Sequence, residues 1–272
     1  MNNFQQRAIT SFFFVLVVVS AILFSKLSFS ILFGAITLLG IMEFYTLTQH
    51  MNLKAQTFMG VLASIVLYGV VGLQTQNLLS AKWLFLLLPI VFGIFILELY
   101  RKHQYPFANI AITLLGVVYV ALPFALLQLI VLPNALLFVP TNLLGFFFIL
   151  WANDTGAYLV GRKFGKTKLF ERISPNKTWE GTLGGVVLAL CVAGIQAQYF
   201  THLTFTNWLI IAMIISTTGA LGDLVESLLK RSIDVKDSGT LLPGHGGILD
   251  RFDGLLIALP FVYTYLVLFV YE

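Results

Sequence analysis

Residues 108–131 read ANIAITLLGVVYVALPFALLQLIV and contain no charged side chain. A helix that crosses a lipid bilayer needs roughly 17–25 mostly apolar residues, so this stretch is long enough to span one. The rest of the chain has a similar character, because 58% of its 272 residues are hydrophobic and 10% are charged. Since water-soluble domains carry about 25% charged residues, the composition excludes an ordinary soluble domain and predicts an integral membrane protein.

Further apolar stretches flank this one on both sides, and the division that follows it lies near Pro133-Asn134. We therefore predict an all-α, polytopic membrane protein with about nine transmembrane helices and a cytoplasmic N-terminus. The predicted spans are 8–24, 29–48, 57–74, 82–99, 108–131, 136–158, 179–200, 206–231 and 250–271.

The basic residues between these spans indicate the orientation. With a cytoplasmic N-terminus, fourteen Lys and Arg residues face the cytoplasm and two, Lys26 and Lys82, face the opposite side. This bias follows the rule that cytoplasmic loops carry an excess of positive charge. Because these residues lie between spans, the net charge of +4 does not indicate nucleic-acid binding. Cys191 is the single cysteine, which excludes an internal disulfide and a thiolate metal site.

Charged residues are concentrated in the second half of the chain. Of the 16 basic and 12 acidic residues, nineteen lie between residues 150 and 253. We predict N-terminal scaffold helices at 1–105, central transmembrane helices at 106–149, and a catalytic transmembrane region with cytoplasmic loops at 150–272. Glu43 and Glu98 lie in early spans without an obvious cationic neighbour, so we expect them to have a packing or interfacial role.

Three carboxylates far apart in the sequence are predicted to share one depth in the membrane. At 1.5 Å per residue, Asp154 and Asp223 lie about 25 Å from the outer ends of their helices, near the boundary where Asp250 begins the last helix. Ionisable groups inside a membrane are costly and by default mark a functional site. Their hard oxygen atoms suit Mg²⁺. In an alternative interpretation, Asp223 and Asp250 form structural ion pairs with Lys230 or Arg251.

Two connections on the predicted cytoplasmic side suit phosphate groups. Residues 233–247 contain Pro and Gly and cannot form a regular helix. Gly246 and Gly247 precede the last helix, whose N-terminus offers unpaired N–H groups to a phosphate. In an alternative interpretation, His245 is only a turn residue. The basic connection at 162–177 could equally be a topology anchor. Together with the carboxylates, these features favour phosphoryl or nucleotidyl transfer.

Within residues 150–254, four motifs resemble those of phosphatidate cytidylyltransferases, also called CDP-diacylglycerol synthases. The motifs are NDTGAY at 153–158, SPNKTWEG at 174–181, GDLVES at 222–227 and SLLKRSIDVKDSGTLLPGHGGILDRFD at 227–253. The last is the most specific, because many positions in it are fixed in the family. Gly254 departs from the family pattern, in which many relatives have Ser, but no proposed role depends on it.

The resemblance implies that the cytidylyl group of CTP is transferred to phosphatidate, which gives CDP-diacylglycerol and pyrophosphate in phospholipid biosynthesis. It implies that Asp223 and Asp250 hold Mg²⁺, with room for a second, monovalent cation such as K⁺. The residues implied to bind phosphates, shape their loop or orient these groups are Lys230, Arg231, Lys236, Asp237, His245, Arg251 and Asp253. The residues implied to complete the substrate pocket are Asn153, Asp154, Lys177, Glu226, Ser227, Gly246 and Gly247. The resemblance also suggests a homodimer in a bacterial inner membrane, with the site facing the cytoplasm.

Two other functions fit the same residues. A CTP-dependent lipid-alcohol kinase, similar to dolichol kinase, would transfer the γ-phosphate of CTP instead of the cytidylyl group. An ion or anion transporter would use the intramembrane carboxylates, although the charges gather at one interface rather than along a path through the membrane.

Overall fold

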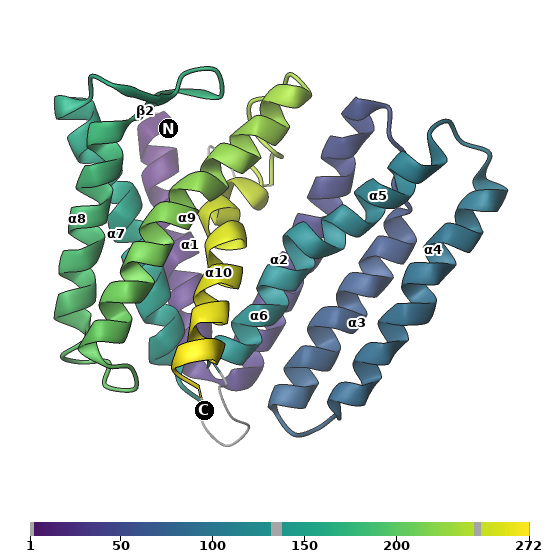
Figure 1. Ribbon diagram of the computed structural model, residues 1–272, viewed down its shortest axis with the longest axis horizontal. Coiled ribbons are helices and arrows are strands. Elements are labelled where there is room, and N and C mark those ends of the chain that lie inside the picture. Colours follow the sequence, from purple (N-terminus) through teal and green to yellow (C-terminus); the bar gives the residue numbers. More distant parts are fainter. Residues whose placement is uncertain (1–2, 132–137, 242–245, 272) are drawn as a thin grey trace. The chain divides into compact units, whose positions relative to one another are not determined.

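The computed structural model describes residues 3–131, 138–241 and 246–271 (Figure 1). Each of the nine predicted spans coincides with a helical segment in this described part, which confirms the all-α, polytopic class. Eight of these segments are long and apolar enough to cross a membrane, and the first contains a shorter apolar helix at Ile9–Phe24. The helices are α1 (Asn3–Phe24), α2 (Lys26–Thr48), α3 (Thr57–Thr75), α4 (Leu87–Arg101), α5 (Pro106–Gly116), α6 (Leu122–Val131), α7 (Pro140–Phe164), α8 (Trp179–Gln196), α9 (Phe205–Ser232) and α10 (Leu249–Phe269).

The span predicted at 108–131 is not one regular helix. A π-helical turn at Val117–Ala121 separates α5 from α6, and the N–H of Leu122 bonds to the carbonyl oxygen of Val117. Pro123 follows directly, and a proline has no N–H and clashes with the carbonyl group four residues earlier. Prolines and π-helical turns are both recognised causes of helix irregularity, so Pro123 accounts for the break between α5 and α6.

A short hairpin joins α7 to α8 within the basic connection. Its antiparallel strands are β1 (Lys168–Phe170) and β2 (Ser174–Thr178), with Lys168 opposite Thr178. The side chain of Thr178 accepts a hydrogen bond from the N–H of Gly181 and so caps α8. The hairpin therefore leads directly into a helix.

The chain divides into two compact units, and each is described by itself. Unit 1 comprises Met1–Phe138 and Asp237–Arg251, and unit 2 comprises Val139–Lys236 and Phe252–Glu272. The core of unit 1 includes Phe33 and Phe124, and that of unit 2 is built around Trp208. The predicted functional regions at 1–105, 106–149 and 150–272 follow other boundaries and stay a prediction.

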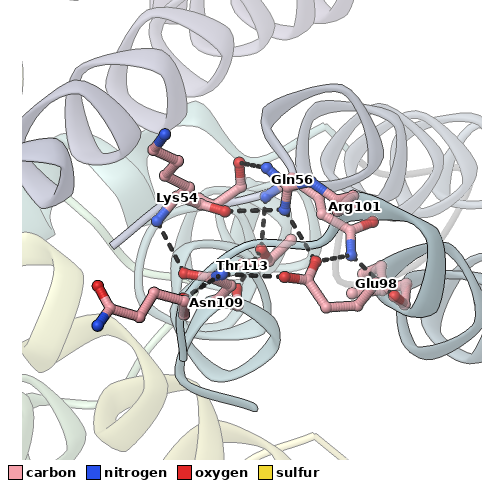
Figure 2. Close-up of polar contacts among 9 residues, drawn as sticks. Lys54, Gln56, Glu98, Arg101, Asn109 and Thr113 are labelled. Carbon is pink, nitrogen blue, oxygen red and sulfur yellow. Dashed lines mark hydrogen bonds and ion pairs between the residues drawn. The ribbon is translucent and has the colours of Figure 1, made fainter. Parts of the chain in front are cut away.

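Glu98, in unit 1, corrects an expectation from the sequence. Its carboxylate is buried and lies 2.9 Å from the guanidinium of Arg101, so it has a cationic partner three residues along α4. Gln56 and Asn109 also donate side-chain hydrogen bonds to it, at 2.7 and 2.9 Å (Figure 2). Arg101 lies just beyond the span predicted at 82–99, and its position one helical turn after Glu98 places its guanidinium beside the carboxylate.

Candidate active site

A polar site lies in unit 2, where β2 contacts α9. The Nζ atom of Lys177 lies 2.6 Å from Oδ2 of Asp223 and donates a hydrogen bond to the carbonyl oxygen of Ala220 at 3.2 Å. A cavity of about 290 Å³ adjoins this ion pair. The charged and amide side chains that line it are those of Asn153, Asp154, Asn176, Lys177 and Asp223. The structure thus brings together four residues predicted for the site, namely Asn153, Asp154, Lys177 and Asp223.

Close packing of α7 on α8 positions one wall of this cavity. A Cβ atom added to Gly156 of α7 would lie 2.7 Å from the carbonyl oxygen of Gly184 in α8. A Cβ atom on Gly185 would likewise lie 2.7 Å from Oδ1 of Asn153. Glycine is therefore required on both helices at this crossing, as is common where membrane helices approach closely. The contact holds Asn153 and its neighbour Asp154 in place.

Asp253 of α10 adds a third carboxylate to unit 2. A Cβ atom on Gly222 would lie 2.5 Å from the carbonyl oxygen of Asp253, so α9 and α10 touch one residue before Asp223. Asp253 lies near enough to Asp154 and Asp223 for their charges to repel. Lys177 is a single ammonium group beside three carboxyl groups. Carboxyl oxygens gathered in this way are ligands of the kind that Mg²⁺ prefers.

The next turn of α9 carries a second, buried ion pair. Glu226 is fully buried, and Nζ of Lys230 lies 3.2 Å from its Oε1 atom. The hydroxyl of Ser227 donates to Oδ1 of Asp223 at 3.3 Å. Asp223 has its ion pair with Lys177, whereas the alternative interpretation had named Lys230 or Arg251. Glu226 and Ser227 therefore position Lys230 and Asp223 within the helix.

Asp250 lies in unit 1, at the start of α10. Its Oδ2 atom accepts hydrogen bonds from the N–H of Ser238 at 2.8 Å and the N–H of Gly247 at 2.9 Å, and it lies 2.9 Å from the hydroxyl oxygen of Ser238. Gly246 has a φ of +78°, and a Cβ atom there would lie 2.3 Å from this oxygen. Gly246 and Gly247 thus allow the backbone to fold against Asp250.

Glu43 of α2 is the functional candidate that sequence reasoning missed. Its carboxylate accepts hydrogen bonds from the N–H groups of Ile248 at 2.9 Å and Leu249 at 3.0 Å, and from the hydroxyl of Ser238. Glu43 caps α10 and holds the residue that contacts Asp250, which are contacts that the expected packing or interfacial role did not include. The available signal was the cost of placing a carboxylate within a membrane span.

The remaining predicted residues lie on the protein surface or outside the described part. Arg231, Lys236, Asp237 and Arg251 are exposed. His245 lies outside the described residues. Asp223 and Asp250, the predicted metal ligands, belong to different units, and each is described within its own.

Across residues 3–131, 138–241 and 246–271, no three or more His, Cys, Asp or Glu side chains form a cluster that could hold a metal by themselves. Magnesium is typically held by only one or two carboxylates and takes its other ligands from water and substrate phosphates. Asp154 and Asp223, which line the cavity of unit 2, fit that requirement.

Comparison with known proteins gives consistent similarities. Residues 5–269 match the cytidylyltransferase family. The phosphatidate cytidylyltransferase of Bacillus subtilis (strain 168) is 35% identical over 99% of this chain and 100% of its own length. The enzymes of the same name from Staphylococcus haemolyticus (strain JCSC1435) and Staphylococcus aureus (strain COL) are each 42% identical over 58% of this chain and 60% of their own lengths.

Proposed function

The chain belongs to the cytidylyltransferase family, and from this membership we propose that it is a phosphatidate cytidylyltransferase, which converts CTP and phosphatidate to CDP-diacylglycerol and pyrophosphate. The similarity to the Bacillus subtilis enzyme over the full length of both chains is the observation that carries the proposal. The polar cavity beside Lys177 and Asp223 supports it, because it offers a cation and hard oxygen ligands for phosphate chemistry.

In this reaction an oxygen of the phosphatidate phosphate attacks the α-phosphorus of CTP. A new phosphorus–oxygen bond forms, the bond from the α-phosphorus to the oxygen bridging to the β-phosphate breaks, and pyrophosphate leaves with that electron pair. The attacking oxygen is already anionic, so the protein has no strong need of a general base. Positioning and charge stabilisation are the main contributions required of its residues.

Membership of this family indicates a metal-ion cofactor, and we assign it as Mg²⁺, with K⁺ as a second cation. When bound, the metal supplies positive charge that stabilises the phosphates. Asp223 and Asp250 are its proposed ligands, on the resemblance and on the preference of Mg²⁺ for carboxylate oxygens. Glu43 and Ser238 hold Asp250, and Lys177 and Ser227 hold Asp223.

The basic side chains are assigned to the phosphates of CTP and of the lipid. Arg231, Lys236 and Arg251 are exposed and therefore accessible to a soluble nucleotide. Lys230 is oriented by Glu226. Asp237 and Asp253 are assigned to orient these cations, and His245, Gly246 and Gly247 to shape the triphosphate loop. Asn153 and Asp154 complete the substrate pocket.

The chain is an integral membrane protein, and we place it in a bacterial inner membrane with the site facing the cytoplasm. The distribution of Lys and Arg supports that orientation. A site at the inner boundary is accessible to CTP from water and to phosphatidate from the lipid leaflet. We also expect a homodimer, on the resemblance alone.

The decisive experiment follows the label from CTP into lipid. Purified protein is incubated with phosphatidate, Mg²⁺ and CTP labelled either in the cytosine ring or at the γ-phosphate. We expect the ring label in the lipid product and the γ-label in pyrophosphate. Lipid labelled from the γ-phosphate alone would identify a lipid kinase, and ion flux in sealed vesicles without CTP turnover would identify a transporter. Either result would overturn the proposal.

A further inference from the structure

Unit 1 contains two neighbouring cavities that are not lined by Glu43, Ser238 or Asp250. The first lies where α2 ends and where α3 and α5 begin, and the second lies where α4 ends and α5 begins. The first has a volume of about 600 Å³ and lies between the loop before α3 and the loop before α5. The second, of about 500 Å³, lies between α4 and α5, and His103 lines both. These volumes fall in the range of roughly 300–1,000 Å³ that is usual for ligand pockets.

A buried polar network fixes the loop before α3, which contains Lys54. Figure 2 shows the carboxylate of Glu98 at its centre. Besides pairing with that carboxylate, Arg101 donates to the carbonyl oxygen of Lys54 at 2.8 Å. Asn109 accepts a hydrogen bond from the N–H of Lys54 at 2.8 Å, and Gln56 donates to Glu98. The ammonium group of Lys54 points away from the network in Figure 2, so the backbone is held while the charge is left outside.

The backbone in both loops adopts conformations that non-glycine residues rarely take. Asn52, Lys102 and Tyr105 have φ values of 57°, 49° and 61°. Conformations of this kind persist where surrounding contacts impose them, and they cluster at binding sites. The Glu98 network provides such contacts, so the shape of the cavity is built into the fold.

The lining of the two cavities is amphipathic. The first is lined by the cationic or ionisable side chains of Lys54 and His103 and by neutral polar groups such as Gln49 and Asn52, and the residues described around it include no carboxylate. The second is mostly apolar, with Phe95, Leu99, Phe107 and Ile110 in its walls and Lys102 at its edge. Glu98 also borders it, but its charge is paired with Arg101. A ligand that fits both cavities has an anionic end and a hydrocarbon end.

We propose that the two cavities form an accessory binding site for an anionic glycerophospholipid. The phosphate lies beside Lys54 and His103, and an acyl chain follows the groove between α4 and α5. Basic pockets between membrane helices are a known way of binding anionic head groups. Tyr45, which lines the first cavity, and Glu43 are two residues apart on α2 and so project from nearly opposite sides of that helix. The site is therefore separate from the contacts that join Glu43, Ser238 and Asp250.

The test uses purified, delipidated full-length protein in neutral detergent, titrated with phosphatidylglycerol and followed by native mass spectrometry. Phosphatidylglycerol is a phosphodiester and so lacks the terminal phosphate that the proposed reaction needs. We expect the double variant Lys54→Gln, His103→Gln to bind it at least about tenfold more weakly. Lys82→Gln is the matched control, because Lys82 lies at the other ends of α3 and α4. It should bind like the wild type, and so should Asp223→Asn, which removes the proposed metal ligand.

Further comparisons identify the ligand class. Glycerol phosphate and inorganic phosphate test a soluble anion, and phosphatidylcholine tests a lipid without net charge. Equal binding of any of these, or unchanged phosphatidylglycerol binding by the double variant, would overturn the proposal. So would an equal loss in Lys82→Gln, since that indicates general attraction to basic surface. If the double variant does not fold, Lys54→Gln is compared with Lys54→Arg, which should retain binding because it keeps the charge.

Discussion

The ammonium group of Lys177 lies 2.6 Å from Oδ2 of Asp223 and fixes the β1–β2 hairpin to α9. The two side chains are 25% and 42% exposed, so water screens much of their attraction. Pairs of this kind contribute about 0–1 kcal/mol to stability. The contact therefore matters less for folding than for placing a cation and a carboxylate side by side in the cavity of unit 2.

Replacing Lys177 by Met should reduce turnover at least about tenfold, because it removes the cation from a site with three carboxylates. The thermal stability in detergent should change little. Lys177→Arg keeps the charge and should retain more activity than the Met variant. Lys168→Met, an exposed lysine in the same hairpin, is the matched control. Equal activities for Lys177→Met and Lys168→Met would contradict the role given to Lys177.

The variants Asp223→Asn and Asp250→Asn should each lower turnover by roughly a hundredfold or more, because an amide is a poor replacement for an anionic magnesium ligand. Incorporation of cytosine label into lipid measures activity, and gel filtration shows whether the variants remain folded. Asp234→Asn makes the same chemical change at an exposed position and should be active. Near-normal activity of both site variants at saturating Mg²⁺ would refute their assignment as metal ligands.

The spans could be predicted because they depend on local hydrophobicity and length. The convergence of Asp154 and Asp223 also followed from their depths along helices. The role of Glu43 could not be predicted from the residues around it, since its partners Ser238 and Leu249 are separated from it by about two hundred residues of sequence. An apolar run with one carboxylate does not indicate which distant loop will contact that carboxylate.

Glu43→Gln should destabilise the start of α10. The new amide group cannot accept hydrogen bonds through its nitrogen, so at least one of the donors Ile248, Leu249 and Ser238 is left without a partner. Loss of a hydrogen bond to a charged group costs about 1.5–3 kcal/mol. We also expect a higher Mg²⁺ concentration at half-maximal activity, because Ser238 then holds Asp250 less firmly. Ser238→Ala should produce the same shift, and the double variant should add little to it. An unchanged Mg²⁺ dependence in both single variants would show that Glu43 does not act through Ser238.

Cys191→Ala should leave turnover and stability unchanged. The thiol is exposed on the apolar helix α8, away from the residues that line the polar cavity. Alanine also favours a helix. Activity and thermal unfolding of the variant provide the check. Leu183→Ala, at an exposed position on the same helix, is the control. A greater loss of activity or thermal stability in Cys191→Ala than in Leu183→Ala would contradict the prediction.

Glu98→Gln tests the polar network of unit 1. The replacement is nearly isosteric, but it removes the charge that pairs with Arg101 and turns an NH₂ group toward the donors Gln56, Asn109 or Arg101. One donor then faces another in a buried place, so the free energy of unfolding should fall by about 1.5–3 kcal/mol. Thermal unfolding in detergent measures the loss, with exposed Glu171→Gln as the matched control. Cytidylyl transfer below the unfolding transition should persist, because the network does not touch Asp250 or Glu43. Loss of activity with unchanged stability would instead place Glu98 in the reaction itself.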